Sequence, residues 1–293
     1  MKYGIFYAYW EREWKEADYQ KYVQKVKNLG FDILEIQCAG LLEIPADTIR
    51  ELAKTAEGCG IELTAGYGPG PHQNLASADE KIVQNAFEFW KKIFDVFALL
   101  KITKVGGGLY SYWPVDYQKP FHKNEDLKRS IERIRELADI AQGYNIVLGM
   151  EVLNRFEGYL LNTAKEAVSY VKAVDRDNVK IMLDTFHMNI EEDSITGAIQ
   201  TAGSLLGHIH LGEANRKPPR AGTRMDWTAI GSALHGIGYT GAAVMEPFVL
   251  KGGQIGNDIK VWRDLAPDSQ AQLDEEAQKS IAFIRKTFQA AGN

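Results

Sequence analysis

The sequence predicts an α/β protein in which all 293 residues form a single (β/α)8 barrel, the TIM-barrel fold, with a further helix at the C-terminus. Three observations predict this fold. Short apolar runs alternate with segments of helical periodicity along the chain. There are eight such runs, the strand count of this barrel. Several runs are almost continuously apolar, as is typical of parallel strands that helices cover on both faces.

The eight expected strands are rich in β-branched or aromatic residues, and the segments between them carry apolar stripes at helical spacing. The strands are expected at Tyr3–Ala8, Asp32–Gln37, Ile61–Ala65, Ile102–Val105, Asn145–Met150, Val179–Leu183, Leu206–His210 and Ala242–Met245. Ser77 and Glu80 suggest a capping box at the start of one helix. We expect Gly30, Gly60 and Gly143 to end helices in the left-handed conformation.

A doubly wound sheet is the main alternative fold. It often carries a glycine-rich phosphate-binding turn after the first strand. Here residues 7–11 read Tyr-Ala-Tyr-Trp-Glu, without the G-x-G-x-x-G pattern. The chain also lacks a Ser/Gly/Pro-rich linker, so residues 1–293 are expected to form one domain.

Composition narrows the class of protein. Hydrophobic residues make up 45% and charged residues 25%, as in ordinary globular proteins. The net charge of −5 provides no basic field for a phosphate backbone, so nucleic acid is not an expected partner. Two cysteines, no signal-peptide pattern and no run of 18 apolar residues lead us to expect a cytoplasmic protein that spans no membrane.

Residues that can bind a metal end four successive expected strands. Glu151, Asp184, His210 and Glu246 follow or end strands five to eight. The carboxyl ends of the strands meet at one face of such a barrel, where active sites lie. Three carboxylates and one imidazole suit a divalent ion such as Mn²⁺, Co²⁺ or Mg²⁺.

Each of these residues also has a structural interpretation. An acid at a strand end often caps a helix or pairs with a neighbouring base. Arg216 could pair with Glu213, and we expect Glu191 and Glu192 to begin a helix, where acids suit the dipole. His208 lies on the same side of its strand as His210, and we interpret it as a buried structural histidine.

Several segments resemble the ketose 3-epimerases, the D-psicose (D-allulose) and D-tagatose 3-epimerases. The resemblance runs over nearly the whole chain and rests on residues 1–10, 151–157, 183–192, 207–216, 245–248 and 260–264. It implies a (β/α)8 barrel with one Mn²⁺ or Co²⁺ ion per subunit, a ketohexose substrate, and a homodimer or homotetramer. It also implies that Glu151, Asp184, His210 and Glu246 bind the metal, the set found above from the strand ends.

The resemblance further implies a substrate-binding set. Glu157, His187 and Arg216 match positions that hold the sugar oxygens near C1 to C3, and Trp14, Gly107 and Trp113 match pocket walls. Two features depart from the family pattern. Phe6 stands where psicose-type members usually have Tyr, and the loop 217–224 is one residue longer than usual. Both leave the preferred ketose open.

The expected reaction is epimerisation at C3 through a cis-enediolate of the sugar. Glu151 and Glu246 would act as base and acid on opposite faces of C3. An aldose–ketose isomerase on the same barrel is the alternative, and it would yield an aldose from fructose. A metal-dependent endonuclease is less consistent with the net charge of −5. A non-catalytic sugar sensor is less consistent with a pair of acids beside the metal.

Overall fold

The computed structural model describes residues 1–15 and 17–292. Eight parallel strands form a closed barrel in the order β1 to β8, with β8 paired to β1. The strands are β1 Lys2–Phe6, β2 Ile33–Gln37, β3 Glu62–Gly66, β4 Lys104–Gly107, β5 Val147–Glu151, β6 Val179–Asp184, β7 Leu206–Leu211 and β8 Ala242–Met245. The expected (β/α)8 barrel is therefore confirmed, and each strand lies within three residues of its predicted place.

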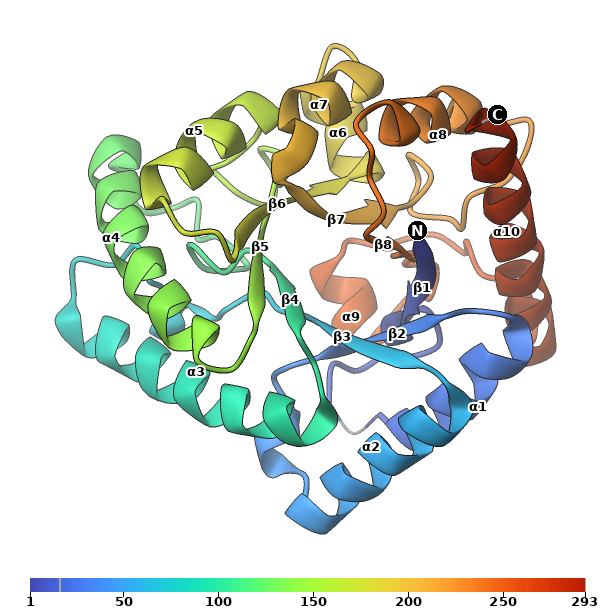
Figure 1. Ribbon diagram of the computed structural model, residues 1–293, viewed down its shortest axis with the longest axis horizontal. Helices are drawn as coiled ribbons and strands as arrows, with labels where there is room; N and C mark the ends of the chain where they lie inside the picture. The colour runs from blue at the N-terminus through green and yellow to red at the C-terminus, as the bar shows by residue number, and fades with distance from the viewer. Residues whose placement is uncertain (16, 293) are drawn as a thin grey trace.

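Helices surround the barrel (Figure 1). They are α1 Tyr19–Leu29, α2 Ala46–Cys59, α3 Glu80–Leu100, α4 Lys123–Gln142, α5 Ala164–Val174, α6 Thr185–Glu191, α7 Ile195–Ala202, α8 Trp227–Gly236, α9 Gly253–Asp258 and α10 Gln270–Ala291. Short 3-10 helices occur at Tyr7–Tyr9, Leu41–Glu43, Pro71–Gln73 and Gly203–Leu205. The C-terminal helix α10 packs beside α8 and α1 and completes the outer ring.

Two faces of each strand have different surroundings, as β2 illustrates. Leu34 and Ile36 belong to the large apolar core between barrel and helices. Ile33 belongs to a small separate cluster with Ala242 and Val244 from β8. Glu35 points across the barrel to a histidine of β7. The interior of the barrel therefore has apolar contacts at one level and polar groups nearer the carboxyl end.

Local details differ from the sequence prediction at three points. The first strand ends at Phe6, because Tyr7–Tyr9 turn into a 3-10 helix. The capping box is wrong: Asp79 caps α3 by accepting from the amide of Lys81. Gly30 and Gly60 end helices with positive φ as predicted, whereas Gly143 has a helical φ of −61°.

Candidate active site

The four predicted metal-binding side chains meet at the carboxyl end of the barrel. Glu151 ends β5, Asp184 ends β6, His210 is the penultimate residue of β7, and Glu246 follows β8. Asp184 and His210 are direct partners in the β6–β7 register. One ligand atom from each residue lies within 4.8 Å of the other three. The parallel register therefore brings together groups that are up to 95 positions apart in the sequence, from 151 to 246.

The imidazole of His210 faces the three carboxylates. Its Nδ1 lies 3.4 Å from Glu246 Oε2, 3.8 Å from Glu151 Oε1 and 4.0 Å from Asp184 Oδ2. This nitrogen is buried and has no hydrogen-bond partner among the described residues. An imidazole nitrogen directed at three carboxylates fits the donor set of a divalent cation.

The negative charge of the three clustered carboxylates is a second reason to expect a bound cation. Burial and the neighbouring Glu246 raise the pKa of Glu151 well above its usual range. Carboxylates that lie this close repel each other and are costly to ionise together without a positive partner. The oxygen-rich set with one nitrogen suits Mn²⁺, Mg²⁺ or Co²⁺ better than a thiolate-binding metal.

Arg216 supplies one positive charge to this cluster. Its Nη1 donates to Glu246 Oε2 at 2.9 Å and to Asp184 Oδ2 at 3.2 Å, and its Nη2 lies 3.5 Å from Glu157 Oε1. The guanidinium stacks over the ring of Phe186 at 3.9 Å. The alternative in which the side chain of Arg216 pairs with that of Glu213 is not observed; the two residues are joined by a backbone hydrogen bond.

His187 and Glu157 are held by a residue that the sequence prediction missed, Asn154. The backbone amide of Asn154 donates to His187 Nδ1 at 3.2 Å, and its side-chain Nδ2 lies 2.8 Å from the same nitrogen and donates to Glu157 Oε1 at 3.1 Å. Because Nδ1 accepts, the neutral ring carries its proton on Nε2, which lies 3.8 Å from Glu151 Oε1. Burial lowers the pKa of His187 to about 3, so the ring is neutral near pH 7.

One cavity of about 340 Å³ joins the predicted site residues. Every predicted site residue except Asp184 lines it, and Asp184 is 1% exposed behind the wall. The lining from the prediction comprises Phe6, Trp14, Gly107, Trp113, Glu151, Glu157, His187, His210, Arg216 and Glu246. Such a concave, largely preformed cavity is the usual setting of a small-molecule site.

Aromatic rings form one side of the cavity. Phe6 packs against Trp14 and Phe248, with ring centroids 6.5 and 6.1 Å apart. Trp14 meets Trp113 edge-on and donates from Nε1 to Asp258 of α9 at 2.8 Å. This hydrogen bond joins the loop after β1 to the loop after β8 across the rim of the pocket.

Gly107 has a backbone reason to be glycine. Its φ is +130°, and an added Cβ would lie 2.1 Å from the carbonyl oxygen of Tyr67. The residue therefore lets β4 and the loop after β3 approach closely at the pocket wall.

Three more of the predicted residues have structural contacts. Asp184 also caps α6, because its Oδ1 accepts from the amide of Phe186 at 2.6 Å. Glu191 ends α6 instead of beginning a helix, and it binds Arg155 through two hydrogen bonds of 2.9 Å. His208 is buried, as predicted, with Nε2 3.1 Å from Glu35 Oε2.

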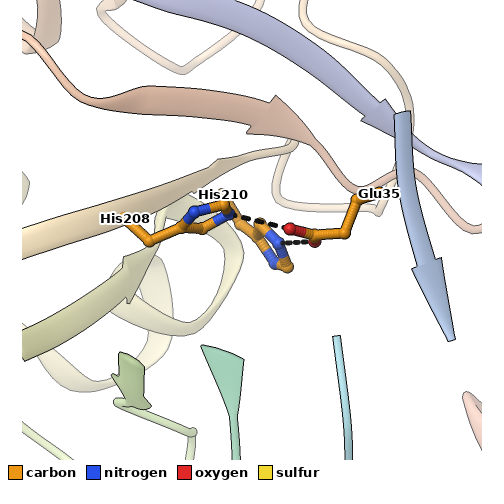
Figure 2. A group of neighbouring side chains, drawn as sticks. All are labelled: Glu35, His208 and His210. Atoms are coloured by element: carbon orange, nitrogen blue, oxygen red, sulfur yellow. Dashed lines mark hydrogen bonds and ion pairs between the residues drawn. The ribbon is translucent and has the colours of Figure 1, made fainter. Parts of the chain in front are cut away.

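Glu35 is the second residue that the sequence prediction missed. It lies in the middle of β2, is 1% exposed, and approaches the imidazoles of His208 and His210 (Figure 2). The sequence contained a signal. A carboxylate inside the apolar run Ile33–Gln37 is costly to bury unless it is paired.

Across residues 1–15 and 17–292, the helices include none with the length and apolarity that a bilayer span requires.

Comparisons with known proteins agree with this architecture. The family described as xylose isomerase-like TIM barrel matches residues 23–287. The D-psicose 3-epimerase of Ruminiclostridium cellulolyticum is 54% identical over 97% of this chain and 97% of its own. That of Agrobacterium fabrum is 50% identical over 97% of this chain and 98% of its own.

The backbone of this chain is also similar to that of a solved structure. The crystal structure of D-psicose 3-epimerase with D-tagatose from Clostridium cellulolyticum H10 superposes with a TM-score of 0.96 at 53% identity. The match covers 98% of this chain and 99% of that one. The chain therefore belongs to the xylose isomerase-like TIM barrel family, and within it to the ketose 3-epimerases.

Proposed function

We propose that this protein inverts the configuration at C3 of free ketohexoses, interconverting D-fructose with D-psicose and D-tagatose with D-sorbose. The observation that carries the proposal is that two glutamates from separate strands, Glu151 and Glu246, line one sugar-sized pocket and lie 3.8 and 3.4 Å from His210 Nδ1. Relatives at 50–54% identity are named D-psicose 3-epimerases, which supports the substrate class.

One divalent ion per chain, Mn²⁺ or Co²⁺, is the proposed cofactor, and Mg²⁺ also fits the donor set. Glu151, Asp184, His210 and Glu246 would hold it. When bound, such an ion supplies positive charge that stabilises the negative charge developing on O2 of the sugar. The buried, unpartnered Nδ1 of His210 supports this assignment.

The protein's own carboxylates perform the proton transfers. One glutamate, ionised, removes the proton from C3, and the bonding electrons move into a cis-enediolate spanning C2 and C3. The other glutamate, protonated, returns a proton to C3 from the opposite face. The two exchange roles when the reaction runs in reverse, because each direction begins with the opposite C3 configuration.

Three further side chains orient the sugar. His187 presents Nε2–H to the pocket, since its Nδ1 is occupied by Asn154, and this donor suits the C2 carbonyl oxygen. Glu157 offers an acceptor to the O1 hydroxyl. Arg216 bridges Glu157 and Glu246 and holds a positive charge beside the reacting carbons.

The aromatic side of the pocket receives the distal part of the ketose. Phe6, Trp14 and Trp113 have apolar surfaces that suit the C–H faces of a sugar. A phenyl ring at position 6 offers no hydroxyl to the sugar, so selection at C4 is expected to be weak.

Aldose–ketose isomerisation is the second candidate, because the matched family takes its description from xylose isomerase. That reaction moves a proton between C1 and C2, whereas epimerisation exchanges a proton at C3 alone. Chromatography of the products separates the two. Fructose incubated with the Mn²⁺-loaded protein should yield psicose and no aldose, and an aldose product would favour the isomerase.

A homodimer or homotetramer completes the proposal, on the basis of the family resemblance, and the low cysteine content supports a cytoplasmic location. Light scattering after size-exclusion chromatography measures the mass of the assembly against the 32.8 kDa chain.

A further inference from the structure

Three strands converge on one buried carboxylate beneath the candidate metal site. Glu35 of β2 accepts from His210 Nε2 of β7 at 2.6 Å through Oε1 (Figure 2). Its Oε2 accepts from Thr64 Oγ1 of β3 at 2.8 Å and lies 3.1 Å from His208 Nε2. Glu35 and Thr64 are direct partners in the β2–β3 register, so the backbone fixes their contact.

This contact determines which nitrogen of His210 is free. A carboxylate at 2.6 Å requires the imidazole to carry its proton on Nε2. In the neutral ring Nδ1 then keeps its lone pair, and this is the atom that faces Glu151, Asp184 and Glu246. The buried Nδ1 has no other partner among the described residues.

We propose that Glu35 is a positioning residue that fixes the tautomer and the ring orientation of His210, so that Nδ1 is presented as a ligand to a divalent ion. The inference rests on the metal site of the proposed function and adds a residue to it. A ligating histidine commonly donates its other N–H to a carboxylate, and loss of such a partner typically weakens metal binding about 10–100-fold.

A second metal ion between Glu35, His208 and His210 is the competing interpretation, since these three residues also cluster. The distances argue against it. Two atoms bound to one tetrahedral ion at about 2.0–2.1 Å lie about 3.3 Å apart. The 2.6 Å between Glu35 and His210 is a hydrogen-bond distance. In addition, His210 would have to bind two ions with its two nitrogens.

The test measures Mn²⁺ binding to apoprotein without sugar, by calorimetry, in a matched series. Glu35→Met has a similar length and no acceptor, and should raise the Kd about 10–100-fold. Glu35→Gln retains an acceptor for Nε2–H and should raise the Kd by a smaller factor. Thr64→Val removes a neighbour of Glu35 and leaves the contact with His210 intact, so its Kd should change least. Circular dichroism in EDTA checks that each apoprotein is folded.

Nitrogen NMR of histidine-labelled apoprotein reads the protonation of the ring in the wild-type protein itself. His210, assigned by comparison with His210→Asn, should carry its proton on Nε2. An Nε2 that carries no proton would overturn the proposal, as would a folded Glu35→Met protein that binds Mn²⁺ as tightly as wild type. Two ions per wild-type chain, one lost in Glu35→Met, would favour the second site instead.

A failure of the role of Glu35 can be distinguished from a failure of the proposed function. Wild-type protein that binds one ion and epimerises ketoses, with Glu35→Met unchanged, rejects the role of Glu35 alone. Wild-type protein that binds one ion, weakened by Glu35→Met, and exchanges no proton at C3 rejects the reaction and retains the role of Glu35.

Discussion

The backbone amide of Asn154 donates a hydrogen bond to His187 Nδ1 at 3.2 Å, and the side chain of Asn154 donates to Glu157 at 3.1 Å. One residue thus orients two proposed sugar-binding groups. Replacement by Ala removes the side-chain contacts, and we expect kcat/KM on D-psicose to fall about 10–100-fold, since a hydrogen bond to a charged group is worth about 1.5–3 kcal/mol.

The neighbouring Arg155 provides the control for this prediction. It forms an ion pair with Glu191 and its side chain is 65% exposed. The side chain of its partner Glu191 is 5% exposed, so Arg155→Ala is expected to lower stability, but neither residue lines the cavity and kcat/KM should stay nearly unchanged. Equal effects of Asn154→Ala and Arg155→Ala would show that the loop, and not the side chain of Asn154, matters.

Removal of either proposed acid–base group should stop turnover. Glu151→Gln and Glu246→Gln keep the shape of the side chain and lose its capacity to exchange a proton. At saturating Mn²⁺ each should lower kcat at least about 100- to 10,000-fold, the range of a general acid or base. Ketose binding, measured by calorimetry, should survive. Appreciable turnover in either variant contradicts the two-base mechanism.

The hydroxyl missing at position 6 should affect the choice of sugar. Phe6 lies against Trp14, Phe248 and the backbone of Gly66 at the pocket wall. Phe6→Tyr adds one polar group there and should shift the ratio of kcat/KM between D-fructose and D-tagatose about 5-fold, equivalent to a hydrogen bond of about 1 kcal/mol. An identical ratio in the two proteins would refute a role in selection at C4.

The neutral, buried His187 should make the metal-free protein sensitive to acid. The unfolded chain binds a proton on this ring below a pKa of about 6.5, whereas burial lowers the folded pKa to about 3. The unfolded state therefore binds more protons between these values, and stability falls as the pH decreases from about 6.5 towards 3.

The size of this effect can be measured by urea unfolding in EDTA. At pH 5 the contribution of His187 amounts to about 2 kcal/mol relative to pH 8. His187→Gln should lose less stability than wild type between pH 8 and pH 5. Parallel stability curves for the two proteins would mean that His187 titrates normally when folded.

The sequence alone predicted the barrel and the meeting of the four strand-end residues because both depend on local pattern plus one rule of topology. Each strand end is visible in the sequence, and a parallel barrel brings all strand ends to one face. Asp184 and His210 are neighbours through register, although 26 positions separate them in the sequence.

The missed residues act through contacts that only the folded chain defines. Glu35 meets His210 across the barrel interior, 175 positions away. Asn154 lies in the segment 151–157 that carries the family resemblance, yet its contact with His187 depends on how the loops after β5 and β6 pack together. Glu35 and Asn154 are polar, and a buried polar group needs a hydrogen-bond partner. The sequence alone did not show which residue that partner is.

Helix ends were predicted less well for a similar reason. Ser77 and Asp79 are both capping residue types, and the structure uses Asp79. The chain after α4 turns with a positive φ of 58° at Asn145, not at Gly143, because Asn tolerates the left-handed region. Local preference allowed both choices, and packing selected one.

Proton exchange at a single carbon tests the account most directly. Wild-type protein loaded with Mn²⁺ is incubated in D₂O with D-fructose, D-psicose, D-tagatose or D-sorbose, and NMR identifies the carbon that gains deuterium. Epimerisation by the two glutamates predicts deuterium at C3, together with the C3 epimer of each sugar. Deuterium at C1 or C2 with formation of an aldose, or no exchange in any of the four ketoses, would contradict it.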